Sequence, residues 1–294
     1  MTAKTALIGV DWGSTNLRVM RLGPGGVVLD RRLDPRGAVG LEPGDFSAVL
    51  AEVAADWLID GAPVLICGMA GARHGWVEAP YCLCPAGVTE VAAALVRPDP
   101  IRDLAIVPGV SFSPGGVLTD VMRGEETQVF GVAADGLIIA PGTHSKWITV
   151  ETGRIVALRT FMTGELFAAV RDATLLGAGM GAPGTDPEAF RRGVGRGLDD
   201  RNLSAALFSV RVESLAGRLE PAGAADYLSG LLVGAEIAGQ EPDRLGGPLT
   251  LVGDPALVAR YVEALEMAGA RDVRTADAGR ATAGGLWRIW EAAR

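Results

Sequence analysis

Cysteine is scarce in this chain of 294 residues, which has only three: Cys67, Cys82 and Cys84. They are too few and too clustered to form a disulfide framework, so the composition fits a reducing, cytoplasmic compartment. Cys82 and Cys84, with His74 and His144 elsewhere, are residue types that can bind zinc. The two cysteines alternate with a leucine, which is more typical of a strand or an extended loop, and we predict no structural zinc.

Long hydrophobic runs are also missing, although 49% of the residues are hydrophobic. No stretch approaches the ~20 apolar residues that a membrane helix needs, and the N-terminus lacks the pattern of a secretory signal. The net charge is −8, which argues against a nucleic-acid surface but permits an anionic small molecule in a cleft. We therefore expect small-molecule partners, neither nucleic acid nor membrane, and the sequence leaves a homodimer open.

Two turns of the same kind are the most informative feature of the chain. In each, an apolar run ends in glycine and hydroxyl residues and then resumes as a β-like run: Asp11-Trp12-Gly13-Ser14-Thr15 after 8–10, and Gly142-Thr143-His144-Ser145 after 137–141. Glycine lets backbone amides approach an anion closely, and hydroxyls add donors. Two such turns, each at the head of a three-strand meander, predict duplicated halves that bind one phosphate chain from opposite sides.

The expected elements follow the same order in both halves. In the first half we expect strands at 5–10, 16–22, 26–33, 64–67 and 104–107, and helices at 45–59, 88–96 and 125–133. In the second we expect strands at 137–140, 145–151, 155–160, 249–252 and 272–276, and helices at 164–211 (broken by glycines), 225–238, 257–265 and 280–293. This order predicts α/β domains at 1–134 and 135–294, with mixed sheets flanked by helices and an interdomain cleft.

Five segments carry a resemblance to a known family: Gly9–Arg18, Gly68–Tyr81, Asp120–Gln128, Pro141–Trp147 and Thr160–Phe167. In this order they resemble the 2-dehydro-3-deoxygalactonokinase family of the actin and hexokinase superfamily. The resemblance implies two ribonuclease-H-like (actin-like ATPase) domains. It also implies that ATP, with Mg²⁺, donates its γ-phosphate to the 6-hydroxyl of 2-dehydro-3-deoxy-D-galactonate, in galactonate catabolism. Closure of the two domains over the sugar would then exclude water.

The resemblance also implies roles for the two turns. The first would bind phosphate through Gly13, Ser14 and Thr15, and Asp11 would hold a hydrated Mg²⁺. An ordinary Asx turn is the alternative interpretation of this segment. The second would bind phosphate through Gly142, Thr143 and Ser145. Many superfamily members have an acidic residue early in this segment, where Pro141 stands here, so a second metal carboxylate is in doubt.

Gly253 opens a Gly-Asp-Pro sequence after an expected strand, where the superfamily packs adenosine, although this tripeptide is also a common turn. The general base is expected between Asp120 and Gln128, because a primary alcohol must lose its proton as it attacks phosphorus. Asp120 is our first choice and Glu125 our second. A carboxylate at a helix start is also favoured by the helix dipole alone, so the sequence leaves the choice open.

A sugar acid needs a cation for its carboxylate, and the planar guanidinium of arginine matches it. Arg73 and Arg123 are the candidates, and surface salt bridges are the alternative for both. His74 and Trp76 lie on the same glycine-rich loop as Arg73 and are further substrate candidates. Two more come from the second half. Lys146 contacts phosphate or substrate or is a solvated strand end, and Glu165 contacts substrate hydroxyls or caps a helix.

Three other functions were weighed. A kinase of another sugar or sugar acid stays open, because the acceptor loop is the least decoded part of the chain. A nucleotide-binding regulator without catalysis is disfavoured by the carboxylates Asp11, Asp120 and Glu125. A dinucleotide-dependent oxidoreductase is rejected, because the first turn opens a strand rather than a helix and lacks the Gly-x-Gly-x-x-Gly spacing.

Overall fold

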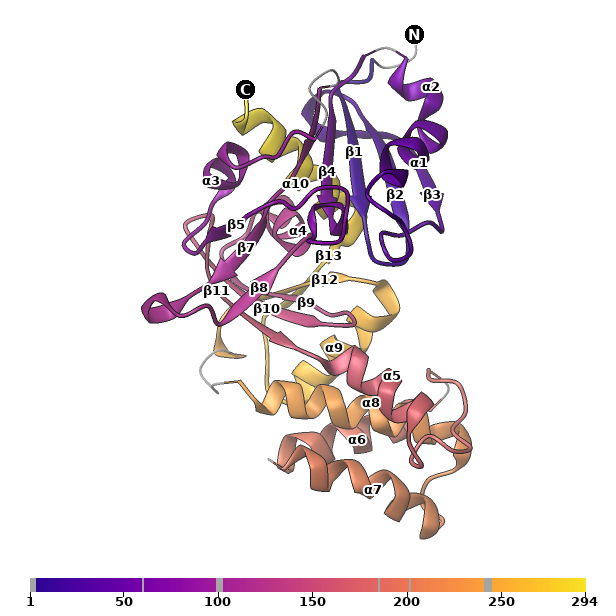
Figure 1. Ribbon diagram of the computed structural model, residues 1–294. Helices are drawn as coiled ribbons and strands as arrows, with labels where there is room; N and C mark the ends of the chain where they lie inside the picture. The colour runs from indigo at the N-terminus through magenta and orange to yellow at the C-terminus, as the bar shows by residue number, and fades with distance from the viewer. Residues whose placement is uncertain (1–3, 60, 99–102, 185, 201, 241–244) are drawn as a thin grey trace. The chain divides into compact units, whose positions relative to one another are not determined.

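The computed structural model describes residues 4–59, 61–98, 103–184, 186–200, 202–240 and 245–294 (Figure 1). The chain divides into two compact units, the first comprising 1–138, 148–159 and 276–294, and the second 139–147 and 160–275. The C-terminal helix thus belongs to the first unit, whereas the expected boundary at 134/135 had assigned it to the second half. The domains 1–134 and 135–294, and the cleft between them, stay predictions.

The first sheet has the strand order β3-β2-β1-β4-β6. Its strands are β1 (Leu7–Trp12), β2 (Leu17–Leu22), β3 (Val28–Asp34), β4 (Val64–Gly68) and β6 (Leu104–Ile106). β1, β2 and β3 form the expected antiparallel meander, and β4 and β6 run parallel to β1. β4 is buried along its whole length, as its apolar sequence predicts for a central parallel strand.

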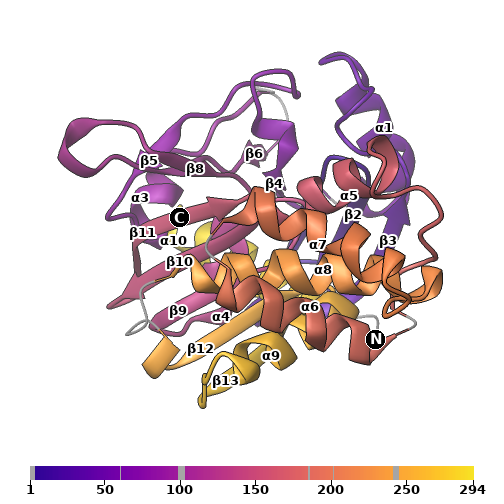
Figure 2. The same cartoon turned by 90° about the horizontal axis from the view of Figure 1, so that it is seen from below.

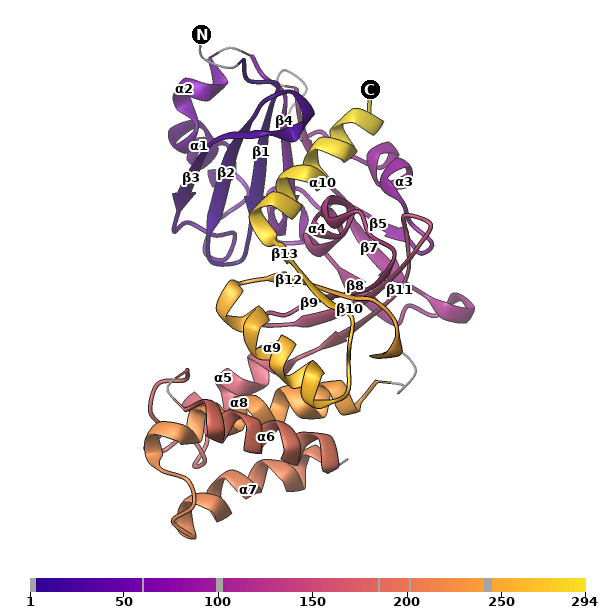
Figure 3. The ribbon, with the colours of Figure 1, turned by 180° about the vertical axis from the view of Figure 1, so that it is seen from behind.

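Helices cover both faces of this sheet. On one face lie α1 (Asp45–Val53) and α2 (Ala55–Leu58), whose Phe46, Leu50 and Trp57 join the core. The single helix expected over 45–59 is broken at Ala54, which leaves helical geometry (φ −112°, ψ 16°). On the other face lies α10 (Ala278–Ala292), as Figure 3 shows.

Glycines allow α10 to pack closely against α4 (Glu125–Val132). A Cβ on Gly131 would lie 1.7 Å from the Ala281 carbonyl oxygen, and one on Gly285 would lie 1.8 Å from that of Thr127. Any larger residue at either position would push the two helices apart. This backbone contact explains why the C-terminal helix is part of the first unit.

A small sheet, β5-β7-β8, completes the first unit. Its strands are β5 (Tyr81–Leu83), β7 (Gly109–Phe112) and β8 (Asp120–Met122), with α3 (Val88–Ala93) nearby in sequence. Three 3₁₀ turns, η1 (Pro24–Gly26), η2 (Met69–Gly71) and η3 (Pro114–Gly116), interrupt the loops. Only β5 was anticipated, as the strand or extended loop around Cys82, and β7 and β8 were missed.

The second five-stranded sheet has the order β11-β10-β9-β12-β13. Its strands are β9 (Gly136–Ala140), β10 (Ser145–Glu151), β11 (Arg154–Phe161), β12 (Leu249–Gly253) and β13 (Val273–Asp277). When the strands of each sheet are numbered in chain order, both sheets place the third strand at one edge, followed by the second, first, fourth and fifth. This repeated order confirms the predicted duplication of the α/β elements.

The second unit carries the helices α5 (Thr163–Ala173), α6 (Pro187–Asp199), α7 (Leu203–Leu215), α8 (Pro221–Ala238) and α9 (Pro255–Met267). The helical region expected over 164–211 is thus three helices, and 185 and 201 lie outside the described residues. α6, α7 and α8 pack together (Figure 2). Within the ranges given above, no helix is both long and apolar enough to cross a membrane.

Candidate active site

The first turn, between β1 and β2, presents hydroxyls on a supported backbone. Gly13 N–H donates to the Asn16 carbonyl oxygen at 2.9 Å, and the carbonyls of Gly13 and Ser14 accept hydrogen bonds from the segment Ala38–Val39. Ser14 and Thr15 are exposed. The turn therefore has its carbonyl oxygens held by the protein and its hydroxyls directed to solvent, as an anion site requires.

Asp11 lies at the end of β1, opposite Cys67 of β4 in register. Its side chain is 18% exposed, and Oδ2 lies 3.1 Å from Nη1 of Arg18. Burial raises the pKa of Asp11, and the neighbouring Arg18 partly opposes that shift. The part of the chain that the structure describes holds no cluster of three or more histidine, cysteine or acidic residues able to bind a metal. Asp11 alone would suit a Mg²⁺ ion bound mainly by phosphates and water.

Two glycines bring the end of β4 and the start of α4 beside β1. Gly68 has φ +88°, and a Cβ on it would lie 2.6 Å from the Trp12 carbonyl oxygen. Gly124 has φ +104°, and its Cβ would lie 3.3 Å from the Cα of Gly68. The end of β1, which carries Asp11, and the start of α4 at Glu125 thus meet at the carboxyl ends of β1 and β4.

The acidic residues expected to include the base occupy different places. Asp120 is on β8 of the small sheet, where Oδ1 accepts a hydrogen bond from Val121 N–H at 2.8 Å. Glu125 begins α4 and accepts from Arg123 N–H at 3.1 Å. The residue before Glu125 therefore packs on the end of β4, which pairs with β1, whereas Asp120 lies on β8.

Glu126, the next residue along α4, is fully buried. Its carboxylate accepts hydrogen bonds from Gly124 N–H at 2.7 Å and from the Thr127 hydroxyl at 3.0 Å. Burial, with a smaller contribution from Glu125, raises the pKa of Glu126 to about 8. In the sequence, Glu126 falls within the segment Asp120–Gln128 where the base was expected, and its burial could not be read from that pattern.

The glycine-rich loop after β4 contains the expected sugar-acid residues. Arg73 and His74 are exposed on a turn, and the Trp76 ring stacks on Phe46 with centroids 6.0 Å apart. Arg123 reaches this loop from the chain before α4. Its Nη2 donates to the Ala79 carbonyl oxygen at 2.7 Å.

The rest of the Arg123 guanidinium is buried beside Tyr81. It lies over the Tyr81 ring at 4.4 Å, and its buried Nε and Nη1 have no hydrogen-bond partner among the described residues. A buried donor left unpaired is costly, so a carboxylate that reached these nitrogens would gain affinity. Of the two arginines expected to bind the sugar acid, Arg123 thus has the stronger structural support.

The second turn, between β9 and β10, is held by the start of α5. Glu165 N–H donates to the Thr143 carbonyl oxygen at 3.0 Å, and a Cβ on Gly164 would lie 2.5 Å from the Gly142 carbonyl oxygen. His144 Nε2 lies 2.6 Å from Glu165 Oε2. The Glu165 side chain thus contacts the turn and does not cap α5.

Two other expected residues follow this turn and are buried. Lys146 is only 6% exposed, and its Nζ donates to the Thr160 hydroxyl at 2.9 Å. The interpretation of Lys146 as a solvated strand end is therefore wrong, because both faces of β10 are covered here. Ser145 is fully buried and donates its hydroxyl to Glu236 at 2.7 Å. The exposed hydroxyl of this turn is that of Thr143.

Gly253 and Asp254 lie at the entrance to α9. A Cβ on Gly253 would lie 3.3 Å from the Pro141 carbonyl oxygen, so this glycine is beside the second turn. The Asp254 carboxylate caps α9 by accepting from Ala256 N–H at 3.0 Å. The Gly-Asp-Pro sequence is thus a helix start that touches a candidate phosphate site.

A largely apolar cavity of about 530 Å³ in the second unit reaches from the second turn to α9. Its walls include Gly142, Gly164, Phe190, Asp254, Leu257 and Arg260. The Arg260 guanidinium lies over the Phe190 ring at 4.3 Å and pairs with buried Asp226 at 2.7 Å. Burial by itself would raise the pKa of Asp226. The N–H groups of Gly184 and Asp186, together with Arg260, lower the pKa by more than that, so it lies below its usual value. One wall of the cavity is therefore polar and fixed.

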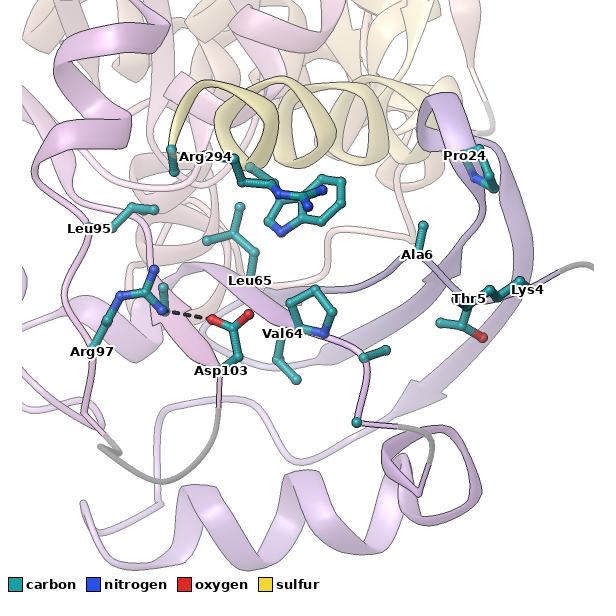
Figure 4. A pocket seen from close by; sticks show the side chains of 16 residues that line it. Lys4, Thr5, Ala6, Pro24, Val64, Leu65, Leu95, Arg97, Asp103 and Arg294 are labelled. Carbon is teal, nitrogen blue, oxygen red and sulfur yellow. Dashed lines mark hydrogen bonds and ion pairs between the residues drawn. The ribbon is translucent and has the colours of Figure 1, made fainter.

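A second cavity, of about 460 Å³, lies in the first unit at the amino-terminal ends of β4 and β6, away from the strand ends that carry Asp11 and Gly68. Figure 4 shows the Arg97–Asp103 ion pair on its wall, with Lys4 and Arg294 nearby. It contains none of the site residues expected from the sequence. Of the expected residues, Gly142 lines the cavity in the second unit.

The repeated strand order, the paired glycine turns and the carboxylate at the end of β1 define a phosphotransferase of the actin-like ATPase fold. The fold is similar to that of the activator of 2-hydroxyisocaproyl-CoA dehydratase from Clostridium difficile with bound ADPNP (TM-score 0.53, 13% identity, 97% of this chain and 95% of that chain covered). The chain belongs to the 2-keto-3-deoxy-galactonokinase family, whose sequence profile matches residues 11–289.

Individual relatives agree with this membership. The chain is 38% identical over 274 residues to the 2-dehydro-3-deoxygalactonokinase of Escherichia coli K12, with 92% of this chain and 91% of that protein covered. The crystal structure of a Sinorhizobium meliloti protein assigned as a 2-dehydro-3-deoxygalactonokinase has a TM-score of 0.87 and 35% identity, with 97% of this chain and 98% of that chain covered. The predicted family and fold class are confirmed.

Proposed function

We propose that this chain is an ATP-dependent 2-dehydro-3-deoxygalactonokinase of galactonate catabolism, which phosphorylates the 6-hydroxyl of 2-dehydro-3-deoxy-D-galactonate. The observation that carries the proposal is the family match from residue 11 to residue 289, which includes both turns and the loops between them. The 38% identity to the Escherichia coli enzyme of that name supports the same substrate. A reducing cytoplasm, where ATP is supplied, suits a chain whose three cysteines are free thiols.

ATP would be bound through both turns. Gly13, Ser14 and Thr15 of the first turn and Gly142 and Thr143 of the second supply backbone amides and exposed hydroxyls to the phosphates. The apolar cavity beside the second turn is large enough for a nucleoside and has Gly142 and Asp254 in its wall, and Gly253, beside Pro141, would lie near the phosphates. Ser145 would support this turn from its buried position rather than contact phosphate.

Asp11 would hold Mg²⁺ together with phosphate oxygens and water. Its partly exposed carboxylate at the end of β1 fits a cation that takes one or two protein carboxylates and keeps several waters. When bound, Mg²⁺ neutralises charge on the phosphates. Asp11 would orient the complex of Mg²⁺ and the phosphates towards the carboxyl end of β4, where α4 begins.

Glu125 would act as the general base, with Asp120 as the alternative. The Glu125 carboxylate would take the proton of the 6-hydroxyl while the hydroxyl oxygen bonds to the γ-phosphorus. The bond from that phosphorus to the bridging oxygen of ADP breaks in the same step. The proton then passes to solvent. The position of Glu125 beside Gly68 and the end of β1 supports this choice.

The loop after β4 would bind the sugar acid. Arg123, with buried guanidinium nitrogens that lack protein partners, and exposed Arg73 would hold its carboxylate, while His74 and Trp76 line the same loop. Lys146 and Glu165 are further contacts that we propose on the side of the second turn. Lys146 is nearly buried, so it would act at short range on a phosphate or on a sugar hydroxyl.

The test is an ADP-release assay over aldonic and 2-keto-3-deoxy sugar acids. We expect the highest kcat/KM with 2-dehydro-3-deoxy-D-galactonate, and the 6-phosphate as product by mass spectrometry. Preference for another acid would identify a kinase of a different sugar acid. ATP binding without turnover on any acid would indicate a non-catalytic nucleotide-binding regulator.

A further inference from the structure

Glu236, in the middle of α8, is a buried carboxylate on which four side-chain donors converge. It is 3% exposed. Oε1 accepts from the Ser145 hydroxyl at 2.7 Å and from the Trp147 indole at 2.6 Å. Oε2 accepts from the Tyr261 hydroxyl at 2.7 Å and from the Thr163 hydroxyl. Both oxygens are therefore fully used within the protein.

The donors come from segments that are far apart in the sequence. Ser145 and Trp147 begin β10, Thr163 begins α5, and Tyr261 lies on α9. Each donor is neutral, so no cation offsets the cost of burying the charge. Burial accordingly raises the pKa of Glu236, although the four hydrogen bonds oppose the shift. An apolar residue of similar size would avoid that cost but would leave four buried donors unpaired, so the carboxylate and its donors form one interdependent unit.

Two of the four donors flank the second turn on either side. Ser145 directly follows the turn residues Gly142–His144, so its hydrogen bond fixes where the turn ends. Thr163 directly precedes Gly164, the residue packed against the Gly142 carbonyl oxygen. Glu165 N–H donates to the Thr143 carbonyl oxygen. Thr163, two residues before Glu165, is thus attached to the same Glu236 carboxylate as Ser145 at the end of the turn.

We propose that Glu236 is a positioning residue, which holds Ser145 and Thr163 so that the turn Gly142–Thr143 keeps the conformation that binds the phosphates of ATP. This inference rests on the proposed function. Glu236 does not itself reach the nucleotide, because both of its oxygens face protein donors. Its loss would weaken nucleotide binding more than sugar-acid binding, since the loop after β4 belongs to the first unit and, of the proposed sugar-acid contacts, only Lys146 and Glu165 lie next to Ser145 and Thr163.

The first variants remove one donor at a time, Ser145→Ala and Thr163→Val. The matched control is Ser209→Ala, which removes a hydrogen bond to Tyr227 (3.0 Å) between α7 and α8 in the same unit. Binding of a non-hydrolysable ATP analogue is measured by calorimetry at a temperature where circular dichroism shows each protein folded. We expect Kd to rise about tenfold for Ser145→Ala and Thr163→Val, because small displacements of positioning groups are costly, and to stay unchanged for Ser209→Ala.

The second comparison changes Glu236 itself. Glu236→Gln keeps the pattern, since its carbonyl accepts from Ser145 and Trp147 and its amide donates to the hydroxyl oxygens of Thr163 and Tyr261. We expect Glu236→Gln to bind the analogue nearly as wild type does, and Glu236→Leu to lose binding or stability. Kinetically, KM for ATP should rise in Ser145→Ala and Thr163→Val by a larger factor than KM for the sugar acid does.

The outcomes separate the two claims. If Ser145→Ala and Thr163→Val lower the melting temperature but bind the analogue as wild type does, Glu236 only stabilises the fold and the inference is wrong. Equal rises in KM for both substrates would also overturn it. If wild type fails to bind the analogue at all, the proposed function fails first, and the inference fails with it.

Discussion

A Cβ atom on Gly124 would lie 3.3 Å from the Cα of Gly68, so the start of α4 is packed directly on the end of β4. β4 in turn is paired in register with β1, with Asp11 opposite Cys67. The residue that begins α4 is therefore positioned by backbone contact with β4, the strand that pairs with the Asp11 end of β1. This relationship is the reason why we propose Glu125 as the general base, rather than Asp120, the first choice from the sequence.

We expect Glu125→Gln to lower kcat by about 100-fold or more, because the 6-hydroxyl would lose its proton acceptor. Asp120→Asn is the matched comparison, and its effect should be much smaller because β8 belongs to the small sheet. KM for ATP should change little in either variant. Steady-state kinetics with saturating Mg²⁺ measures both effects. A large loss in Asp120→Asn with an active Glu125→Gln would reverse the assignment.

Glu126 makes the stability of the first unit depend on pH. Its pKa rises from an ordinary 4.5 to about 8 in the folded chain. The folded chain therefore holds this proton more tightly than the unfolded chain does. The protonated Glu126 side chain therefore contributes to the free energy of unfolding. This contribution is fully present below pH 4.5 and is lost as pH rises towards 8.

Glu126→Gln should remove this loss, because an amide does not titrate. The wild-type free energy of unfolding should fall by up to about 1.4 kcal/mol per pH unit in this window from Glu126 alone. Urea unfolding from pH 5 to pH 8 checks the slope. Glu291→Gln, an exposed change on α10, is the control and should keep the wild-type slope. A Glu126→Gln slope equal to the wild-type slope would contradict the prediction.

Gly164→Ala tests the packing of α5 on the second turn. A Cβ there would lie 2.5 Å from the Gly142 carbonyl oxygen and 2.8 Å from the Thr143 Cα, both backbone atoms. We expect KM for ATP to rise by about tenfold or more, because the turn must move. Gly195→Ala on α6 is the control, since its Cβ would meet open space. That control should stabilise the protein by about 0.5–1 kcal/mol without changing KM. An unchanged KM in Gly164→Ala would show that the turn tolerates displacement.

Local patterns predicted the two five-stranded sheets well. The run Val64–Cys67 is apolar throughout and lies in a sheet centre, and the glycine turn at Gly13 joins two strands as expected. The small sheet was largely missed because β8 has only three residues and β5 pairs with β7 in parallel, across a long stretch of sequence. The break at Ala54 has no glycine or proline to signal it.

The candidate site was predictable where function requires exposed residues and was missed where it depends on burial. Ser14, Thr15 and Thr143 are as accessible as the turn patterns suggested. Glu236 escaped notice because its donors are supplied by β10, α5 and α9, which sequence spacing does not bring together. A lone glutamate within the apolar helix 225–238 was the available signal. Lys146 is buried because both faces of β10 are covered, which no alternating pattern would reveal.

Arg123→Met tests whether the buried guanidinium binds the sugar acid. Methionine keeps much of the apolar contact with Tyr81 but removes the charge and the bond to the Ala79 carbonyl oxygen. A hydrogen bond to a charged group contributes about 1.5–3 kcal/mol, so KM for the sugar acid should rise by about tenfold or more. KM for ATP should stay constant. Arg97→Met, which breaks the exposed pair with Asp103, is the control and should change neither KM. If Arg123→Met lowers the melting temperature and leaves KM for the sugar acid unchanged, Arg123 only stabilises the loop, and Arg73 becomes the remaining arginine candidate.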